Sequence, residues 1–203
     1  PDLYEMLGKA VGQAQEDRSV RCLLLTGAGR AFCVGADLKA HADGPMSRDE
    51  RRAYIASAQA VNESIQRCRV PVVAAVNGHA IGAGLELALS ADFVVVAEDA
   101  KLRLPEVALG TFVGGGVSYR LPQRVGDLKA RELILLGRFF SGTEAEAFGL
   151  ANRALPAGEV LKASLDLAQE VAAGAPLSME HAKRLLNLGS ASSPDEILAE
   201  EAT

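Results

Sequence analysis

Cysteine and histidine are scarce in this chain, and their spacing excludes the common metal sites. The sequence of 203 residues has three cysteines, Cys22, Cys33 and Cys68, with no CxxC pair among them, and three histidines that are equally scattered. Neither a zinc-ligand spacing nor an HExxH helix is available, so we predict no metal site. An odd number of distant cysteines is typical of reduced, mostly buried thiols, which predicts a cytoplasmic location.

A surplus of positive charge and long apolar runs are also missing. The chain has 21 Lys and Arg against 26 Asp and Glu, so it lacks the basic excess that binds phosphates and we predict no nucleic-acid partner. No run approaches the roughly 20 apolar residues of a membrane span, and no signal or transit peptide is recognisable, so we predict no membrane partner. The hydrophobic content of 49% suits the core of one domain, with or without a small appendage.

Buried-strand patterns alternate with helical patterns through the first half of the chain. Apolar runs bounded by Gly or Pro predict strands, and apolar residues that recur every three to four positions predict helices. Ser47 and Glu50 form a predicted capping box at the start of one helix. This alternation favours an α/β layered fold with largely parallel strands. The predicted strands lie at residues 20–26, 72–76 and 92–97, and the predicted helices at residues 3–15, 47–69 and 82–91.

The last third of the chain is mostly helical in pattern. Thr143 and Glu146 have the spacing of a second capping box, and residues 151–155 predict one short strand. The apolar stripes of these helices predict packing within the core or against other subunits. The predicted helices lie at residues 127–137, 143–149, 159–174 and 176–188.

Two carboxyl groups stand alone in apolar segments. Glu86 lies in the run Leu85–Leu89, which is apolar on both sides of the acid and predicts a buried helix. Glu106 is the single acid in residues 104–109. An unpaired buried carboxylate is costly, so such a group is usually paired, protonated or catalytic. The two acids together predict a dry pocket for acid–base chemistry; the alternatives are an arginine partner for Glu86 and a surface loop for Glu106.

Glycine-rich turns follow two of the predicted strands. Residues 35–36 come after the first strand and residues 82–84 after the second, near strand ends of the kind where ligands bind in α/β sheets. A turn that enters a helix presents unpaired backbone N–H groups, and two such turns that face one point make an oxyanion hole. The alternative is that these glycines only relieve steric crowding. A dinucleotide-binding fingerprint is not supported, because residues 27–32 have phenylalanine where the third glycine belongs.

Six segments of the sequence match motifs of one known family. They are residues 29–38 (GRAFCVGADL), 71–86 (PVVAAVNGHAIGAGLE), 104–106 (LPE), 114–116 (GGG), 120–121 (RL) and 147–152 (AFGLAN). On these segments the chain resembles the enoyl-CoA hydratase/isomerase (crotonase) superfamily over nearly its whole length. The resemblance implies a crotonase-like spiral of ββα turns in residues 1–140 and a helical C-terminal trimerisation region in residues 141–203. It also implies a homotrimer or homohexamer, and we expect the family's usual N-terminal strand pair and C-terminal tail to lie outside this chain.

The resemblance further implies the substrate and the residues that act on it. The substrate is an acyl-CoA thioester, so coenzyme A is part of the substrate and no separate cofactor is expected. Backbone N–H groups of Ala36 and Ala83 would hold the thioester oxygen, Glu86 and Glu106 would be the two catalytic acids, and Gly114 would help to hold the catalytic water.

Other substrate contacts follow from the same resemblance. Val113, Val117 and Tyr119 stand where many members of the family carry Pro, Gly and Gln, which leaves the acyl group and its length open. The implied substrate and CoA contacts are Arg30, Ala36, Asp37, Leu38, Lys39, Phe112 and Val113.

The presence of both acids decides between the branches of the family. Hydratases use two acids, whereas isomerases and several other branches keep one. We therefore predict an enoyl-CoA hydratase, a hydro-lyase that adds water across the 2,3 double bond. The alternatives are an enoyl-CoA isomerase or another thioester-enolate enzyme, and a non-catalytic CoA-binding subunit, against which both acids speak.

Overall fold

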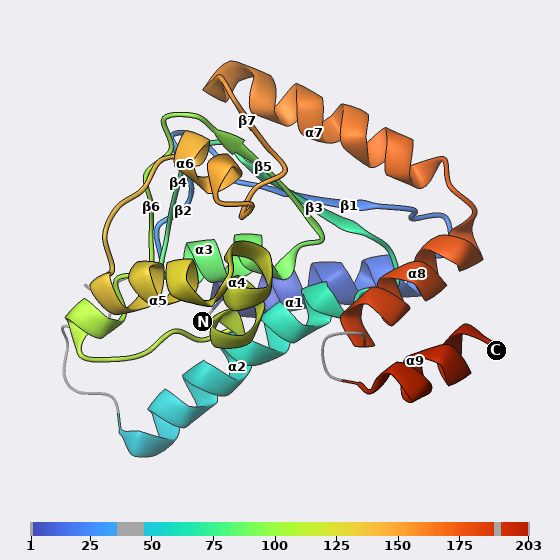
Figure 1. The fold of residues 1–203 in the computed structure, drawn as a ribbon, viewed down its shortest axis with the longest axis horizontal. Coiled ribbons are helices and arrows are strands. Elements are labelled where there is room, and N and C mark those ends of the chain that lie inside the picture. Colours follow the sequence, from blue (N-terminus) through green and yellow to red (C-terminus); the bar gives the residue numbers. More distant parts are fainter. Residues whose placement is uncertain (1, 36–46, 189–191, 203) are drawn as a thin grey trace.

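The computed structural model describes residues 2–35, 47–188 and 192–202 (Figure 1). The strands are β1 (Leu23–Thr26), β2 (Ala31–Cys33), β3 (Val72–Val76), β4 (His79–Ile81), β5 (Phe93–Ala97), β6 (Leu102–Arg103) and β7 (Arg153–Leu155). The helices are α1 (Asp2–Glu16), α2 (Arg48–Gln66), α3 (Ala83–Ser90), the 3-10 helix η1 (Val107–Leu109), α4 (Val117–Val125), α5 (Asp127–Leu136), α6 (Gly142–Ala147), α7 (Ala157–Ala172), α8 (Pro176–Leu188) and α9 (Pro194–Glu201).

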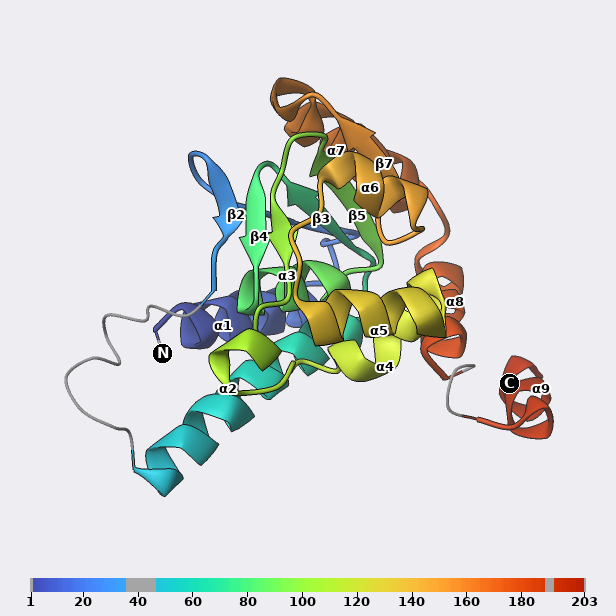
Figure 2. The same ribbon diagram turned by 60° about the vertical axis from the view of Figure 1, so that its left-hand side comes forward.

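The described strands form two parallel sheets to which the chain contributes alternately. One sheet has the order β1-β3-β5-β7 and the other the order β2-β4-β6, and every ladder is parallel. Each of the pairs β1–β2, β3–β4 and β5–β6 gives one strand to each sheet before the chain turns into helix, as Figure 2 shows. This is the predicted spiral of ββα turns, which is confirmed. Because β7 pairs with β5, the segment after residue 140 also contributes to the larger sheet, and the domain division at that residue stays a prediction.

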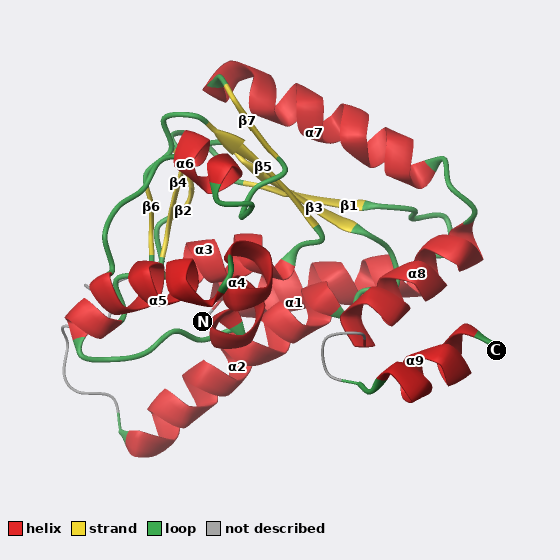
Figure 3. Ribbon diagram, in the orientation of Figure 1, coloured by secondary structure: helices red, strands yellow, loops and turns green. Residues whose placement is uncertain are grey.

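The centre of the larger sheet is buried on both faces. All five residues of β3 are buried, and four of the five residues of β5 are. Such strands read as continuous apolar runs, which is why they are visible in the sequence. Helix α7 lies on one side of the sheet and helices α1, α2 and α3 on the other, as Figure 3 shows. The core therefore fills the layers on both sides of β3 and β5.

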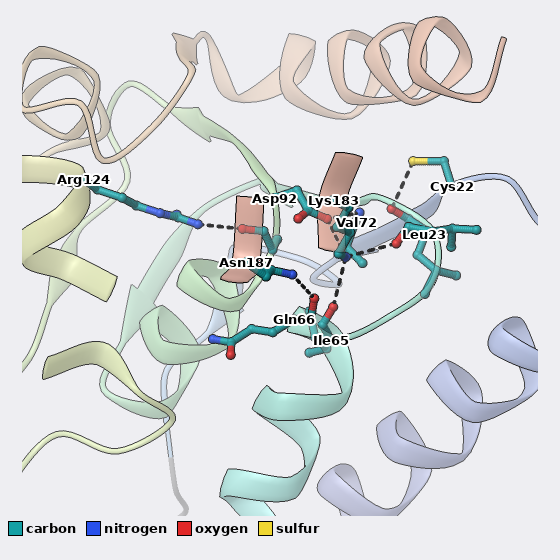
Figure 4. A network of polar contacts seen from close by, with 11 residues as sticks. Cys22, Leu23, Ile65, Gln66, Val72, Asp92, Arg124, Lys183 and Asn187 are labelled. Carbon is teal, nitrogen blue, oxygen red and sulfur yellow. Dashed lines mark hydrogen bonds and ion pairs between the residues drawn. The ribbon is translucent and has the colours of Figure 1, made fainter. Parts of the chain in front are cut away.

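A buried lysine attaches α8 to the core. The Nζ of Lys183 donates to the backbone oxygens of Ile65 and Val70 and lies 2.7 Å from Oδ2 of Asp92, which also accepts from the N–H of Val72 (Figure 4). The Lys183 side chain is only 6% exposed. One ammonium group thus links α8 to the end of α2 and to the starts of two core strands.

The strands of the smaller sheet are not evident in the sequence pattern. The sequence pattern predicts a loop from Phe32 onward, which is wrong for the residues of β2, and it predicts no strand at residues 79–81, where β4 lies. Strands of two or three residues carry too little alternation to show a period. Pairing with a neighbouring strand decides their conformation.

Two helices also differ from expectation, and one cap is displaced. Helix α4 contains Pro122, which weakens its helical pattern, and neither α4 nor α9 is predicted. The predicted box at Thr143 and Glu146 is wrong, because Ser141 caps α6 and pairs with Glu144. Phe140 is bridged to Leu102, so the extended backbone ends at residue 140 and the helix can begin directly after Ser141.

Candidate active site

The first predicted acid lies one turn into a short buried helix. Seven of the eight residues of α3 are buried, and the Glu86 side chain points into this interior at 6% exposure. Apolar residues surround the acid in sequence, so the helix is buried all round and carries the carboxyl with it. The predicted burial of Glu86 is confirmed.

The turn that begins α3 brings the second acid close. Gly82, which precedes α3, has φ 54° and ψ −124°, a conformation that residues with a side chain rarely adopt. A Cβ atom on Gly82 would lie 2.9 Å from Oε1 of Glu106. Glu106 itself caps η1 and is only 9% exposed, so the alternative of a surface acid is wrong. The absence of a side chain at Gly82 leaves room for the Glu106 carboxyl beside the start of α3.

Both carboxyl groups line one cavity of about 320 Å³. The cavity is formed by α1, α2, the start of α3 and the loop from Pro105 to Gly115, and most of its exposed lining is apolar. The lining residues are Tyr4, Val34, Gly35, Tyr54, Ile55, Ala58, Gln59, Ile81, Gly82, Ala83, Glu86, Pro105, Glu106, Leu109, Thr111, Phe112, Gly114 and Gly115.

The Glu86 carboxyl is held by a backbone donor. The N–H of Gly114 donates to Oε1 of Glu86 with a separation of 2.6 Å. Burial raises the pKa of Glu86, while the Gly114 N–H and the charge of Arg120 act in the opposite direction. Among the described residues, no salt bridge includes Glu86, so the alternative of an arginine-paired acid is not what the structure shows.

The Glu106 carboxyl is less constrained. Its Oε2 is buried and has no hydrogen-bond partner in the described structure. Burial raises the pKa of Glu106, and the nearby charge of Glu86 raises it further, whereas Arg103 lowers it. Two interacting carboxyls in a largely apolar cavity titrate as a pair, so one tends to keep its proton while the other is ionised. The pair can therefore offer a proton donor and a proton acceptor at the same time.

One of the two predicted oxyanion donors lies at this cavity. Ala83 is the first residue of α3, where backbone N–H groups have no acceptor within the helix. A Cβ atom on Gly35 would lie 3.8 Å from the Ala83 nitrogen, so the first residue of the predicted turn at residues 35–36 lies near the start of α3. The residues that follow Gly35 in this prediction, Ala36, Asp37, Leu38 and Lys39, lie outside the described residues.

Some of the remaining predicted contacts line the cavity and others do not. Phe112 lines the cavity and is 74% exposed, and Gly114 lines it while its N–H is directed at Glu86. Val113 packs against the hydrophobic core and is not among the lining residues. Arg30 lies exposed in the turn between β1 and β2 and is not among the lining residues.

Two tyrosines of the cavity were not singled out from the sequence. Tyr4 on α1 and Tyr54 on α2 both line it, with ring centroids 5.8 Å apart and an interplanar angle of 63°. Burial raises the pKa of Tyr4, and interactions with Tyr54 raise it further. The sequence feature that could have identified them is a tyrosine on an otherwise apolar helix face. Such a residue suggests a site, because a buried hydroxyl needs a hydrogen-bond partner.

No group of three or more His, Cys, Asp or Glu side chains suited to a metal ion occurs in residues 2–35, 47–188 and 192–202. Over the same residues, no helix has both the length and the apolar character needed to cross a bilayer.

The comparisons with known proteins agree with one another. The family model described as enoyl-CoA hydratase/isomerase matches residues 1–203. The chain is 38% identical over 193 residues to the mitochondrial methylglutaconyl-CoA hydratase of Homo sapiens, covering 93% of this chain and 56% of that protein. It is 35% identical over 188 residues to an enoyl-CoA isomerase/hydratase of Mycosarcoma maydis, covering 92% of this chain and 68% of that protein.

The solved structures extend this similarity to the fold. The crystal structure of an enoyl-CoA hydratase from Bacillus anthracis matches with a TM-score of 0.94 and 35% identity, covering 99% of this chain and 78% of that one. The chain spans 56% to 61% of the length of the human and rat methylglutaconyl-CoA hydratases that it matches.

Proposed function

Because the chain belongs to the enoyl-CoA hydratase/isomerase family, we propose that it is an enoyl-CoA hydratase that adds water across the 2,3 double bond of an acyl-CoA thioester. The observation that carries the proposal is the pair of buried carboxyls, Glu86 and Glu106, on one largely apolar cavity. An isomerase can carry one proton between two carbons with a single acid, whereas the addition of water takes a proton from water and delivers one to the α-carbon. The acyl group is left open.

The thioester carbonyl is placed at the start of α3. There the N–H of Ala83 and the positive end of the helix dipole favour negative charge on the carbonyl oxygen. The second proposed donor is the N–H of Ala36, which follows the neighbouring glycine turn. Removing one such donor costs roughly 3–4 kcal/mol of barrier in comparable sites.

Hydration then proceeds with the two acids in different protonation states. One carboxylate takes a proton from water as the hydroxyl oxygen bonds to the β-carbon, and the electron pair of the double bond moves to the thioester oxygen. The other carboxyl delivers its proton to the α-carbon. The reaction neither oxidises nor reduces the substrate, so the proposed chemistry needs no redox cofactor. Burial raises the pKa of both acids, which favours the protonated form of the acid that delivers the proton.

The variants Glu86→Gln and Glu106→Gln test the proposal. Each is expected to lower the hydration of a 2-enoyl-CoA at least about 100-fold, because glutamine fills the same space without exchanging a proton. Glu63→Gln is a suitable control, since Glu63 is exposed on α2 and pairs with Arg67. Near-normal turnover by either cavity variant contradicts the two-acid mechanism.

A second candidate is a double-bond isomerase that uses Glu106 chiefly. The Gly114 N–H already binds Glu86, whereas the buried Oε2 of Glu106 has no partner in the described structure and is the better placed proton carrier. A panel of 2-enoyl and 3-enoyl thioesters separates the two candidates. Conversion of 3-enoyl substrates without net hydration favours the isomerase, and tight acyl-CoA binding with no turnover of any thioester favours a non-catalytic subunit.

A structure with acetoacetyl-CoA, a stable mimic of the enolate, tests the geometry directly. We expect its thioester oxygen beside the N–H of Ala83 and its reacting carbons between Glu86 and Glu106. An acyl group bound elsewhere on the surface contradicts the proposed site.

A further inference from the structure

A cluster of polar side chains that do not line the cavity contacts α3 at and beyond Glu86. The guanidinium of Arg120, on α4, donates from Nε to the backbone oxygen of Leu89 at 3.1 Å and from Nη2 to Oγ of Ser90 at 3.0 Å. The Ser90 hydroxyl faces two acceptors, Oδ1 of Asn62 at 2.6 Å and the backbone oxygen of Glu86 at 2.9 Å. We call Arg120, Ser90 and Asn62 the Arg120 cluster. It joins α4 and α2 to the last turns of α3.

The same cluster holds the glycine loop that precedes α4. Nη2 of Arg120 also donates to the backbone oxygen of Gly115 at 2.5 Å. On the other side, a Cβ atom on Gly115 would lie 2.7 Å from Cγ of Asn62, and Gly115 has φ +55°. The loop is therefore bound at its carbonyl by Arg120 and packed at its Cα against Asn62, immediately after the residue whose N–H binds Glu86.

We propose that Arg120 is a positioning residue for the proposed hydration: by binding the carbonyl of Gly115 and the C-terminal end of α3, it holds the Gly114 N–H against Oε1 of Glu86. The inference rests on the proposed function for its kinetic consequences. Arg120 does not line the cavity and acts on Glu86 only through the loop and through its charge. The planar fork of arginine suits this role, because it binds three acceptors in fixed directions.

The contribution of Arg120 can be measured as a change in the pKa of Glu86, because charged groups surround this acid. The ionisable groups that interact with Glu86 are Arg120 from α4, Glu106 before η1 and Tyr4 from α1, while Tyr54 from α2 lines the same cavity. Burial lowers the pKa of Arg120 to about 10, so it stays charged at neutral pH. Its charge and the Gly114 N–H both favour the ionised form of Glu86, and loss of either raises the pKa of this acid.

The test compares Arg120→Gln and Arg120→Lys with a matched control, Arg124→Gln. Arg124 lies on the same helix and is also buried, but it donates to the backbone oxygen of Ala91 and does not touch the glycine loop (Figure 4). With Glu86 as the carboxylate that takes the proton from water, we expect the acid limb of the kcat profile of Arg120→Gln to move up by about one pH unit, with kcat at least about ten-fold lower and KM within about two-fold of the wild type. Arg120→Lys keeps the positive charge but loses the planar guanidinium that binds three acceptors. Its pH profile should therefore shift less than that of Arg120→Gln, while its kcat should stay nearly as low. The control variant Arg124→Gln should leave both the pH profile and kcat unchanged.

A direct titration separates this inference from the proposed function. The pKa of Glu86 is followed by 13C NMR of labelled glutamate, with Glu86→Gln to assign the signal, and this measurement needs no turnover. If the wild-type chain hydrates no thioester, the proposed function fails, yet an upward shift of the Glu86 titration in Arg120→Gln still supports the positioning role. If Arg120→Gln does not fold, Arg120→Lys and Ser90→Ala carry the same comparison. Glu86 titrations that match the wild type in these variants overturn the proposal.

Discussion

At the scale of single residues, the chain keeps two carboxyl groups where the surroundings disfavour their charge. Glu86 and Glu106 are almost fully buried, and burial raises the pKa of both. A group whose pKa is raised by folding binds its proton more tightly in the native state than in the unfolded chain. Its protonated form therefore stabilises the fold, and that contribution is lost as the pH rises through the native pKa.

We predict a corresponding pH dependence of stability. Between the ordinary glutamate pKa and the raised native values, the free energy of unfolding should fall with rising pH, by up to about 1.4 kcal/mol per pH unit for each acid. The double variant Glu86→Gln/Glu106→Gln should lose this slope and be more stable than the wild type at neutral pH. Urea unfolding at a series of pH values measures it. Identical pH dependence in the wild type and the variant contradicts the raised pKa values, since all other acids are common to both.

At the scale of elements, the start of α3 is the point on which the site depends. Its N-terminal residue Ala83 offers the proposed donor, its first turn carries Glu86, and the preceding Gly82 has no side chain and so leaves room for the Glu106 carboxyl. All three features depend on one short helix, and the residue that precedes this helix must adopt a positive φ. The packing of α8 likewise depends on one residue. The Lys183 side chain links this helix to elements that are far apart from it in sequence.

Replacing Gly82 by alanine should damage the site and the fold together. The new Cβ meets the Glu106 carboxyl, and the backbone angles are unfavourable for alanine, so we expect a loss of about 1–3 kcal/mol in the free energy of unfolding and a large loss of activity. Gly12→Ala is the matched control. A Cβ there meets nothing within 4 Å on helix α1, and this variant should gain about 0.5–1 kcal/mol. Equal effects of the two changes in chemical denaturation argue against the special role of Gly82.

Removal of the Lys183 ammonium should destabilise the protein far more than removal of a surface lysine. Lys183→Ala removes one donor each from the Asp92 carboxylate and from two backbone oxygens, and we expect a loss of at least about 2 kcal/mol. Lys162→Ala breaks an exposed pair with Asp166 on α7 and should cost less than about 0.5 kcal/mol. Thermal or urea unfolding of both variants measures the two losses in the free energy of unfolding. A similarly small loss in each would show that other contacts hold α8.

At the scale of the whole molecule, the surface keeps large apolar side chains in contact with water. Leu128, Leu135 and Leu136 of α5 and the following Phe139 are each more than half exposed. Large apolar side chains exposed along one segment are typical of contacts with another protein. Their exposure is in keeping with the expected homotrimer or homohexamer, which stays a prediction.

Sedimentation equilibrium of the chain tests that prediction. The expected mass is about three or six times the 21.2 kDa of one chain, because burying the exposed apolar side chains between copies releases water from them. The measurement is repeated over a range of protein concentrations. A single species with the mass of one chain at every concentration contradicts the expected assembly.

The sequence by itself determined the buried strands at residues 72–76 and 92–97, the apolar surroundings of Glu86 and Glu106, and the family motifs, because each of these depends on residues that are close together in the chain. Only the tertiary structure decided the strands of the smaller sheet, the place of Tyr4 and Tyr54 in the cavity, and the contacts of Gly114 and Arg120 with α3. These join segments about 20 to 50 positions apart, and the local pattern around each of them fits a core, a loop or a cap equally well. Packing and hydrogen bonding across the fold therefore select among conformations that the local sequence leaves open.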